Sequence, residues 1–194
     1  MFLCYSYDAT GHLIVAGVPD NFDANGNMLI DGNKTNTYNG FNQLVSTTVD
    51  AKTLEYKYNA DGLRTEKTVD GVTTTYVLDS DQVVMELNSD YTVAKRYLRG
   101  FNLISSDTGK STLKTYYNYN AHGDVTQLVN AAGTVTRNYK YDSFGNEIDK
   151  EPTDTNVFRY SGEAVDLETG YIYLRARYYD PVTSRILFED SFTR

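Results

Sequence analysis

The sequence has no tryptophan, only three prolines and a single cysteine among its 194 residues. Because Cys4 has no partner within the chain, the fold does not depend on an internal disulfide. No stretch approaches the roughly 20 apolar residues that a membrane-spanning helix needs, so we expect no membrane span. The first residues lack the basic region of a signal peptide. We therefore expect export by another route or a start inside a longer chain, and we favour the second.

Positive charge is also scarce. The chain carries 18 Lys and Arg against 26 Asp and Glu, a net charge of −8 at pH 7. Proteins that bind nucleic acid normally present a basic face to the phosphates. We therefore expect no nucleic-acid partner.

Tyrosine, by contrast, is abundant, with 18 copies, and many of these fall in a repeated motif. An aromatic residue is followed by Asp or Asn and, three residues after that, by Gly. The clear copies are Tyr7, Asp8 and Gly11; Phe22, Asp23 and Gly26; Tyr58, Asn59 and Gly62; Tyr119, Asn120 and Gly123; and Tyr141, Asp142 and Gly145. The tyrosines lie about 15 to 22 residues apart, and the motif is divergent between residues 65 and 115.

Each copy is typical of a β-hairpin. The Asp or Asn side chain can close a turn, and the glycine can adopt the positive φ that such a turn requires. Between the turns, polar and apolar residues alternate: Leu54, Tyr56 and Tyr58 share one face, as do Val135, Arg137, Tyr139 and Tyr141. The sequence therefore predicts an all-β fold of antiparallel hairpins, stacked into a curved strip or part of a β-shell because one hairpin cannot bury its own apolar face.

The last third of the chain carries a second motif. It runs from Phe158 to Gly162 and then from Asp166 through Gly170, Tyr171, Arg175, Arg177, Tyr178, Tyr179 and Asp180 to Pro181. Together the two motifs resemble the YD-repeat (Rhs) family and its repeat-associated core segment. On this resemblance, residues 1–140 are the YD-repeat region and residues 141–194 the core segment, and we expect the two to form one continuous structural unit. Ser184-Arg185-Ile186 departs from the Gly-Arg-Phe that is usual in the family.

The resemblance implies a structural casing fragment without catalysis, extracellular or at the cell surface. Its expected partner is the remainder of its own polypeptide or an enclosed toxin. A surface-adhesion module that binds glycans through exposed tyrosines is the alternative. A further alternative is the remnant of an aspartyl autoprotease, with Asp180 and Asp190 as weak candidates, because two carboxylates that share a proton can act as acid and base.

No cofactor or metal is expected. Asp23, Asn25 and Asn27 are spaced like part of a calcium loop, but Lys34 stands where such a loop needs a bidentate acid. His12 and His122 lie near turns without a second ligand at zinc spacing. Arg159, Arg175, Arg177 and Arg185 are expected to pair with carboxylates. Unpaired strand edges predict self-association.

Overall fold

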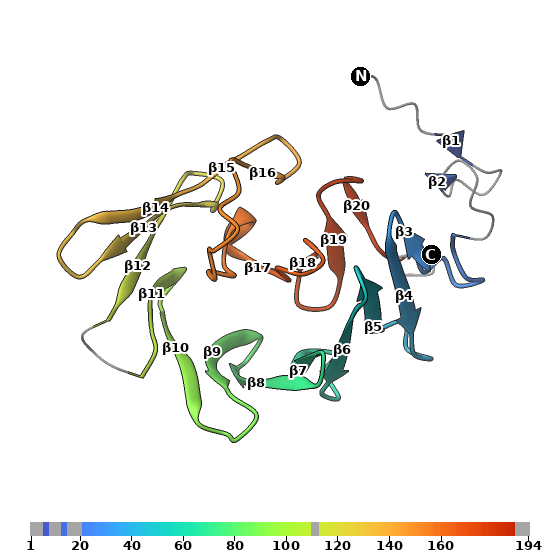
Figure 1. Ribbon diagram of the computed structural model, residues 1–194, viewed down its shortest axis with the longest axis horizontal. Coiled ribbons are helices and arrows are strands. Elements are labelled where there is room, and N and C mark those ends of the chain that lie inside the picture. The colour runs from blue at the N-terminus through green and yellow to red at the C-terminus, as the bar shows by residue number, and fades with distance from the viewer. Residues whose placement is uncertain (1–5, 8–12, 15–20, 110–112, 189–194) are drawn as a thin grey trace.

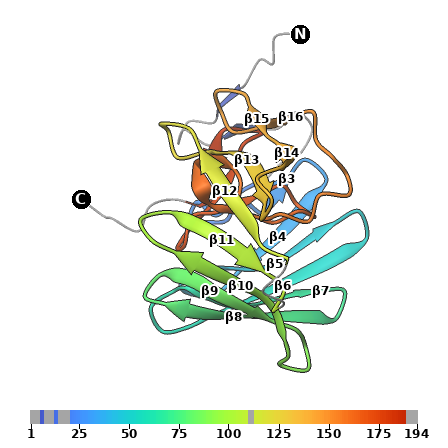
Figure 2. The same ribbon diagram turned by 90° about the vertical axis from the view of Figure 1, so that its left-hand side faces the viewer.

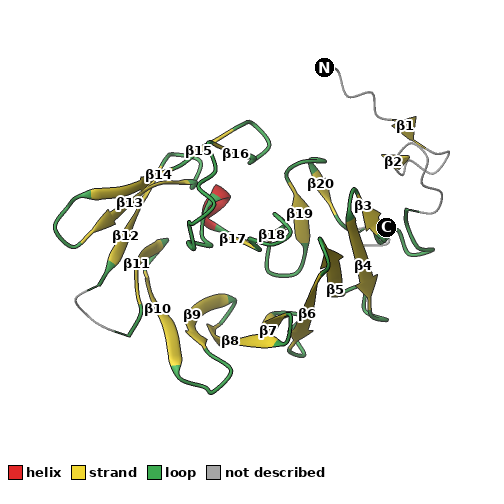
Figure 3. Cartoon of the chain, viewed as in Figure 1, coloured by secondary structure: helices red, strands yellow, loops and turns green. Residues whose placement is uncertain are grey.

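The computed structural model describes residues 6–7, 13–14, 21–109 and 113–188, and it consists of short antiparallel strands joined by tight turns (Figures 1 and 3). The strands are β1 (Ser6–Tyr7), β2 (Leu13–Ile14), β3 (Ile30–Asp31), β4 (Lys34–Tyr38), β5 (Leu44–Val49), β6 (Lys52–Tyr58), β7 (Arg64–Val69), β8 (Val72–Asp79), β9 (Gln82–Leu87), β10 (Val93–Arg99), β11 (Leu103–Asp107), β12 (Thr115–Tyr119), β13 (Val125–Asn130), β14 (Val135–Asn138), β15 (Lys140–Tyr141), β16 (Glu147–Ile148), β17 (Ala164–Val165), β18 (Ile172–Tyr173), β19 (Tyr178–Asp180) and β20 (Arg185–Ile186). A 3-10 turn, η1, spans Tyr160–Gly162. The predicted all-β class is confirmed.

Strands β3 to β14 form one 12-stranded sheet in which every strand pairs with its neighbours in the sequence. We call it the outer sheet. It bends into an arc, with β3 and β4 at one end and β12 to β14 at the other (Figures 1 and 2). The predicted curved strip of antiparallel hairpins is therefore present.

The turns of the repeat are closed by their Asp or Asn side chains. Asn59 Oδ1 accepts hydrogen bonds from the main-chain N–H groups of Asp61 and Leu63, and Gly62 has a φ of 78°. The hairpin between β5 and β6 is turned instead by Asp50 and Ala51, both with positive φ and without a glycine. That turn carries no signal in the sequence.

The register of the outer sheet shifts beside each repeat turn. Within these hairpins the shifts occur at Tyr38, Tyr58, Leu78, Arg99 and Tyr119, which are the last residues of their strands except for Leu78, the last but one. Such β-bulges add local twist and bend the strand that carries them. These five shifts lie along one rim of the outer sheet.

Side chains alternate across the outer sheet as expected for β6, where Leu54 and Tyr56 are buried and Glu55 and Lys57 are exposed. The expectation that Val135 shares a face with Tyr139 is wrong. Val135 is 42% exposed and Tyr139 is 4% exposed. A register shift between Leu128 and Val129 places one extra residue in the opposing strand, and this reverses the alternation.

Strands β17 to β20 form a second antiparallel sheet, the inner sheet. It lies inside the arc and faces its concave side (Figure 1). Two hydrophobic clusters fill the space between the sheets. One joins residues of β5 and β6 to Tyr171, Tyr173, Tyr178 and Leu187, and the other joins residues of β10 to β13 to Tyr139 and Phe158. In the part of the chain that the structure describes, no helix is long and apolar enough to cross a membrane.

Candidate functional site

The predicted site residues meet where the outer and inner sheets contact each other. The repeated tyrosines of this region join consecutive hairpins by hydrogen bonds. A side-chain donor at the end of one strand donates to a main-chain carbonyl of the preceding hairpin. The pairs are Tyr38 Oη to Met28 O (3.0 Å), Tyr58 Oη to Leu44 O (2.6 Å), Arg99 Nε to Val83 O (2.9 Å), Tyr119 Oη to Leu103 O (2.7 Å) and Tyr141 Oη to Val125 O (2.9 Å).

Most of these acceptors lie at a bulge. Leu44, for example, pairs across its hairpin with Tyr38, the preceding donor of the series. The hydroxyl group therefore satisfies a carbonyl that the irregular ladder exposes. Phenylalanine would fill the same space without this bond, which explains why the motif uses tyrosine. Arg99 supplies the donor where the motif has diverged.

The middle of the interface holds a buried ion-pair cluster. Arg64 Nη1 of β7 lies 3.0 and 2.8 Å from the two carboxylate oxygens of Asp166, which follows β17. Lys67 Nζ lies 3.2 Å from Asp166 and 2.6 Å from Glu168. The Arg64 guanidinium is also surrounded by tyrosine rings, with centroids of Tyr56, Tyr76, Tyr173 and Tyr178 at 4.5 to 5.8 Å.

Electrostatics favour the charged form of this cluster. Burial alone would raise the pKa of Asp166, but the charges of Arg64 and Lys67 outweigh it and hold that pKa below the ordinary value of 3.8. Burial alone would lower the pKa of Arg64, but the charge of Asp166 outweighs it and holds that pKa well above its ordinary value. The sequence identified Asp166 only as a residue of the core-segment motif. In the structure it joins the inner sheet to β7.

A second buried cluster joins the β3–β4 hairpin to β19. Lys34 Nζ lies 3.1 Å from Asp31 Oδ2 and 3.8 Å from Asp180 Oδ1. The Tyr171 hydroxyl donates to Asp31 Oδ2 at 2.9 Å. Asp180 also accepts hydrogen bonds from the N–H groups of Val182 and Thr183 and from the Thr183 hydroxyl. These bonds are those of a turn-forming aspartate before a proline.

The autoprotease candidates are therefore not brought together by the described residues. Asp180 faces Asp31 and Lys34, whereas Asp190 lies outside the described residues, as do Asp8 and Gly11 of the first repeat; of Tyr7 only the strand β1 is described. The pairing of Asp180 with Asp190 stays a prediction.

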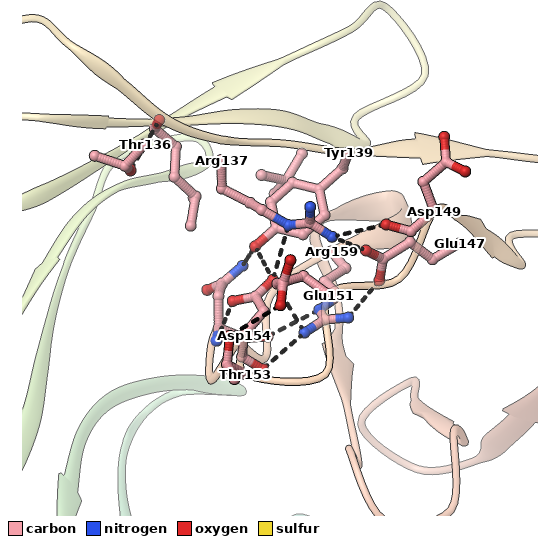
Figure 4. A network of polar contacts seen from close by, with 12 residues as sticks. Thr136, Arg137, Tyr139, Glu147, Asp149, Glu151, Thr153, Asp154 and Arg159 are labelled. Carbon is pink, nitrogen blue, oxygen red and sulfur yellow. Dashed lines mark hydrogen bonds and ion pairs between the residues drawn. The ribbon is translucent and has the colours of Figure 1, made fainter.

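A third network closes the far end of the arc (Figure 4). The guanidinium groups of Arg137 and Arg159 both contact the carboxylates of Glu147 and Asp154. The Tyr139 hydroxyl donates to Asp154 Oδ2 at 2.7 Å. Two positive and two negative charges balance here, and each side chain also has hydrogen-bond partners, which is the condition for burying charge without a large penalty.

The remaining motif residues also lie at the interface. The Tyr179 hydroxyl donates to Phe144 O at 2.9 Å, and Asn146 Nδ2 donates to Pro181 O at 2.8 Å. Arg175 pairs with Asp81 of the outer sheet and with Glu163, and Arg177 also makes an interaction. Gly162 and Gly170 both have positive φ.

Gly145 is required for a close approach. Its φ is 91°, and a Cβ atom there would lie 2.6 Å from Tyr160 Cδ1. The ring of Tyr160 can pack on this turn only because no side chain is present.

Open space at the interface is small. One cavity of about 160 Å³ lies between β7 to β9 and β17, lined by Arg64, Lys67, Glu86 and Asp166 among others. A second, of about 190 Å³, lies beside Glu147, Asp154 and Arg159. Pockets for small molecules usually measure about 300–1,000 Å³. Within residues 21–109 and 113–188, no group of three or more His, Cys, Asp or Glu side chains is arranged to hold a metal ion.

Sequence reasoning missed several charged partners: Asp31, Lys34, Arg64 and Lys67 of the outer sheet, Glu147 of β16, and Asp154 of the loop that follows it. A signal for some of them existed. Lys34 and Asn36 precede Tyr38 at alternate positions, so they occupy the inward face that the tyrosine marks. A charged residue on an inward face predicts a buried partner.

Comparisons with known proteins agree with this architecture. The RHS Repeat family model matches residues 119–150. The tRNA nuclease WapA of Bacillus subtilis is 38% identical over 168 residues, which is 82% of this chain and 7% of that protein. Salivary gland surface protein 1 of Aedes aegypti is 29% identical over 158 residues, covering 72% of this chain and 5% of that protein. The chain thus spans less than a tenth of these relatives.

Solved structures share the fold. TcdB2-TccC3 without its hypervariable C-terminal region is similar over 96% of this chain and 11% of that chain, with a TM-score of 0.73 and 20% identity. The Photorhabdus luminescens Tc holotoxin pore is similar over 96% of this chain and 12% of that chain, with a TM-score of 0.69 and 18% identity.

Proposed function

The chain belongs to the RHS-repeat family, and on this premise we propose that it forms part of the wall of a protein shell that encloses a toxic cargo. The observation that carries the proposal is the tyrosine series. Donors at Tyr38, Tyr58, Arg99, Tyr119 and Tyr141 tie one hairpin to the preceding one along the strip. Such a strip can be lengthened hairpin by hairpin into a wall.

The inner sheet supports the same function. It buries polar as well as apolar side chains against the concave face, and its ion pairs lie at one end and in the middle of the arc. We infer that it holds the arc at a fixed curvature. The division between a repeat region, residues 1–140, and a core segment, residues 141–194, is part of this proposal.

We propose that any catalysis in the relatives belongs to parts outside the region that this chain matches. WapA is named a tRNA nuclease, and this chain corresponds to 7% of it. We propose that the segment itself is inert, works outside the cell, and has the rest of its own polypeptide or an enclosed toxin as its partner. Among the tyrosines whose side chains the structure describes, Tyr91 is 72% and Tyr116 37% exposed and the others less, so no row of exposed tyrosines supports glycan binding.

Electron microscopy of the full gene product tests the wall. We expect residues 21–188 to form a curved wall with enclosed density on one side. A particle in which the concave side of the arc and the inner sheet face bulk solvent would contradict the proposal.

Catalysis needs a separate assay. The purified chain is incubated with total tRNA while its intact mass is followed for several days, and we expect intact tRNA and a constant mass. Cleaved tRNA would show nuclease activity in this segment, and a loss of mass would show self-cleavage.

A further inference from the structure

The cluster of Asp31, Lys34 and Asp180 contains two carboxylates and one ammonium group, and the three come from both sides of the interface. Asp31 ends β3 and Lys34 begins β4, while Asp180 ends β19. Figure 1 shows these strands beside one another at one end of the arc. Asp31 is 6% and Asp180 1% exposed, so water screens their repulsion poorly.

The two carboxylates differ in how they are held. Asp180 accepts three hydrogen bonds from its own turn, given by Val182 and Thr183. Asp31 accepts hydrogen bonds from the side chains of Lys34 and Tyr171. Burial and the nearby carboxylate of Asp180 raise the pKa of Asp31, so Asp31 is the group whose protonation we consider.

Other polar groups around the cluster do not remove this asymmetry. The Lys34 ammonium lies 4.1 Å from the centre of the Tyr171 ring and makes a cation–π contact with it. The Tyr38 hydroxyl on β4 donates to Met28 O rather than to Asp31. On the other side, Arg185 of β20 is the register partner of Asp180 in the inner sheet.

We propose that Asp31 is a proton-operated latch, which tightens the contact between the β3–β4 hairpin and the inner sheet in mild acid and loosens it as the pH rises. Protonation of Asp31 leaves one carboxylate and one ammonium in the cluster and removes the repulsion between the two acids. The latch does not depend on the proposed shell function, because it concerns only the contact between two described parts of this chain.

The direction of the effect follows from proton linkage. Burial raises the pKa of Asp31, the nearby charge of Asp180 raises it further, and Lys34 and Tyr171 only partly oppose these effects. A carboxyl whose pKa is higher in the folded than in the unfolded chain stabilises the fold below its unfolded pKa of about 3.9. That contribution is lost as the pH rises through the higher pKa of the folded state.

Hydrogen exchange at one amide reports on the latch. The Met28 N–H donates to Leu187 O at 2.7 Å, so it bridges the strand segment before β3 and the residue after β20. We compare the protection factor of this amide, corrected for intrinsic exchange, at pH 5 and pH 8. We expect protection in the wild type to be severalfold higher at pH 5 than at pH 8, because the raised pKa of Asp31 favours the folded contact on the acid side.

Two variants make the test specific. Asp31→Asn carries no titratable proton, and the pH dependence of Met28 protection should disappear. Asp61→Asn changes an exposed carboxyl on a neighbouring repeat turn and should keep the wild-type pH dependence. Urea unfolding of the three proteins at both pH values gives a second readout, in which only Asp31→Asn should gain stability relative to the wild type at pH 8. Equal wild-type protection at both pH values, or an unchanged pH dependence in Asp31→Asn, would overturn the latch.

Discussion

The hydroxyl group of Tyr58 donates a hydrogen bond to the main-chain carbonyl of Leu44, while the hydroxyl group of Tyr56, on the same face of the same strand, is buried without a hydrogen-bond partner among the described residues. Two residues apart, they provide a matched pair. Tyr58→Phe leaves a carbonyl at the bulge unsatisfied and should destabilise the fold by about 1–2 kcal/mol. Tyr56→Phe removes only an unpartnered hydroxyl and should be neutral or stabilising. Urea unfolding of both variants checks this, and equal losses would contradict the role of the hydroxyl bond.

Arg64 should be among the most sensitive positions in the chain. Arg64→Met leaves Asp166 buried with only Lys67 beside it, and the expected loss is about 3–5 kcal/mol in the free energy of unfolding. Lys57→Met breaks the exposed pair of Lys57 and Glu66, whose atoms are 2.7 Å apart. That control should cost less than about 1 kcal/mol. Similar losses in the two variants would mean that the Arg64 cluster contributes no more than a surface pair.

The Asp166 cluster should also contribute to acid unfolding. Burial alone would raise the pKa of Asp166, but the positive charges of Arg64 and Lys67 outweigh this effect and lower that pKa in the folded chain. A lowered pKa gives stability that is present above the unfolded value of about 3.9 and is lost as the pH falls through the folded value. Urea unfolding between pH 3 and pH 7 should show this loss in the wild type. Asp166→Asn, less stable at pH 7, should have a shallower slope in acid, and an identical slope would refute the assignment.

Alanine substitutions at Gly145 and Gly133 distinguish two effects of an added side chain, backbone strain and steric overlap. Both have positive φ, but a Cβ at Gly145 would meet the Tyr160 ring, whereas a Cβ at Gly133 has no atom within 4 Å. Gly133→Ala should cost about 1–2 kcal/mol for backbone strain alone. Gly145→Ala should cost about 2–4 kcal/mol because overpacking adds to the strain. Thermal unfolding measures both, and a smaller loss at Gly145 would show that Tyr160 moves aside freely.

The edge of the outer sheet at β14 should support self-association. Among the described strands β14 pairs only with β13, and Val135 is largely exposed on it. Val135→Lys places a charge on this edge and should lower the apparent mass in light scattering at high protein concentration. Thr37→Lys, an exposed position on β4, should leave it unchanged. A wild type that stays monomeric across the concentration series would contradict this expectation.

Local features could be predicted from the sequence because they depend on neighbouring residues. The face shared by Leu54, Tyr56 and Tyr58 follows from a period of two, and the turn at Gly62 follows from its motif. The reversal at Val135 could not be predicted, because a bulge inserts its extra residue without changing composition. The partnership of Asp31, Lys34 and Asp180 was also hidden, since it depends on how the chain folds back inside the arc.

The bulges beside the repeat turns determine how such a strip can grow. The shifts at Tyr38, Tyr58, Leu78, Arg99 and Tyr119 lie along one rim of the outer sheet, and a bulge bends the strand that carries it. We therefore expect part of the bend of the arc to come from each hairpin separately, in addition to the contacts of the inner sheet. A strip with more hairpins of this kind would then be longer but would keep a similar local curvature.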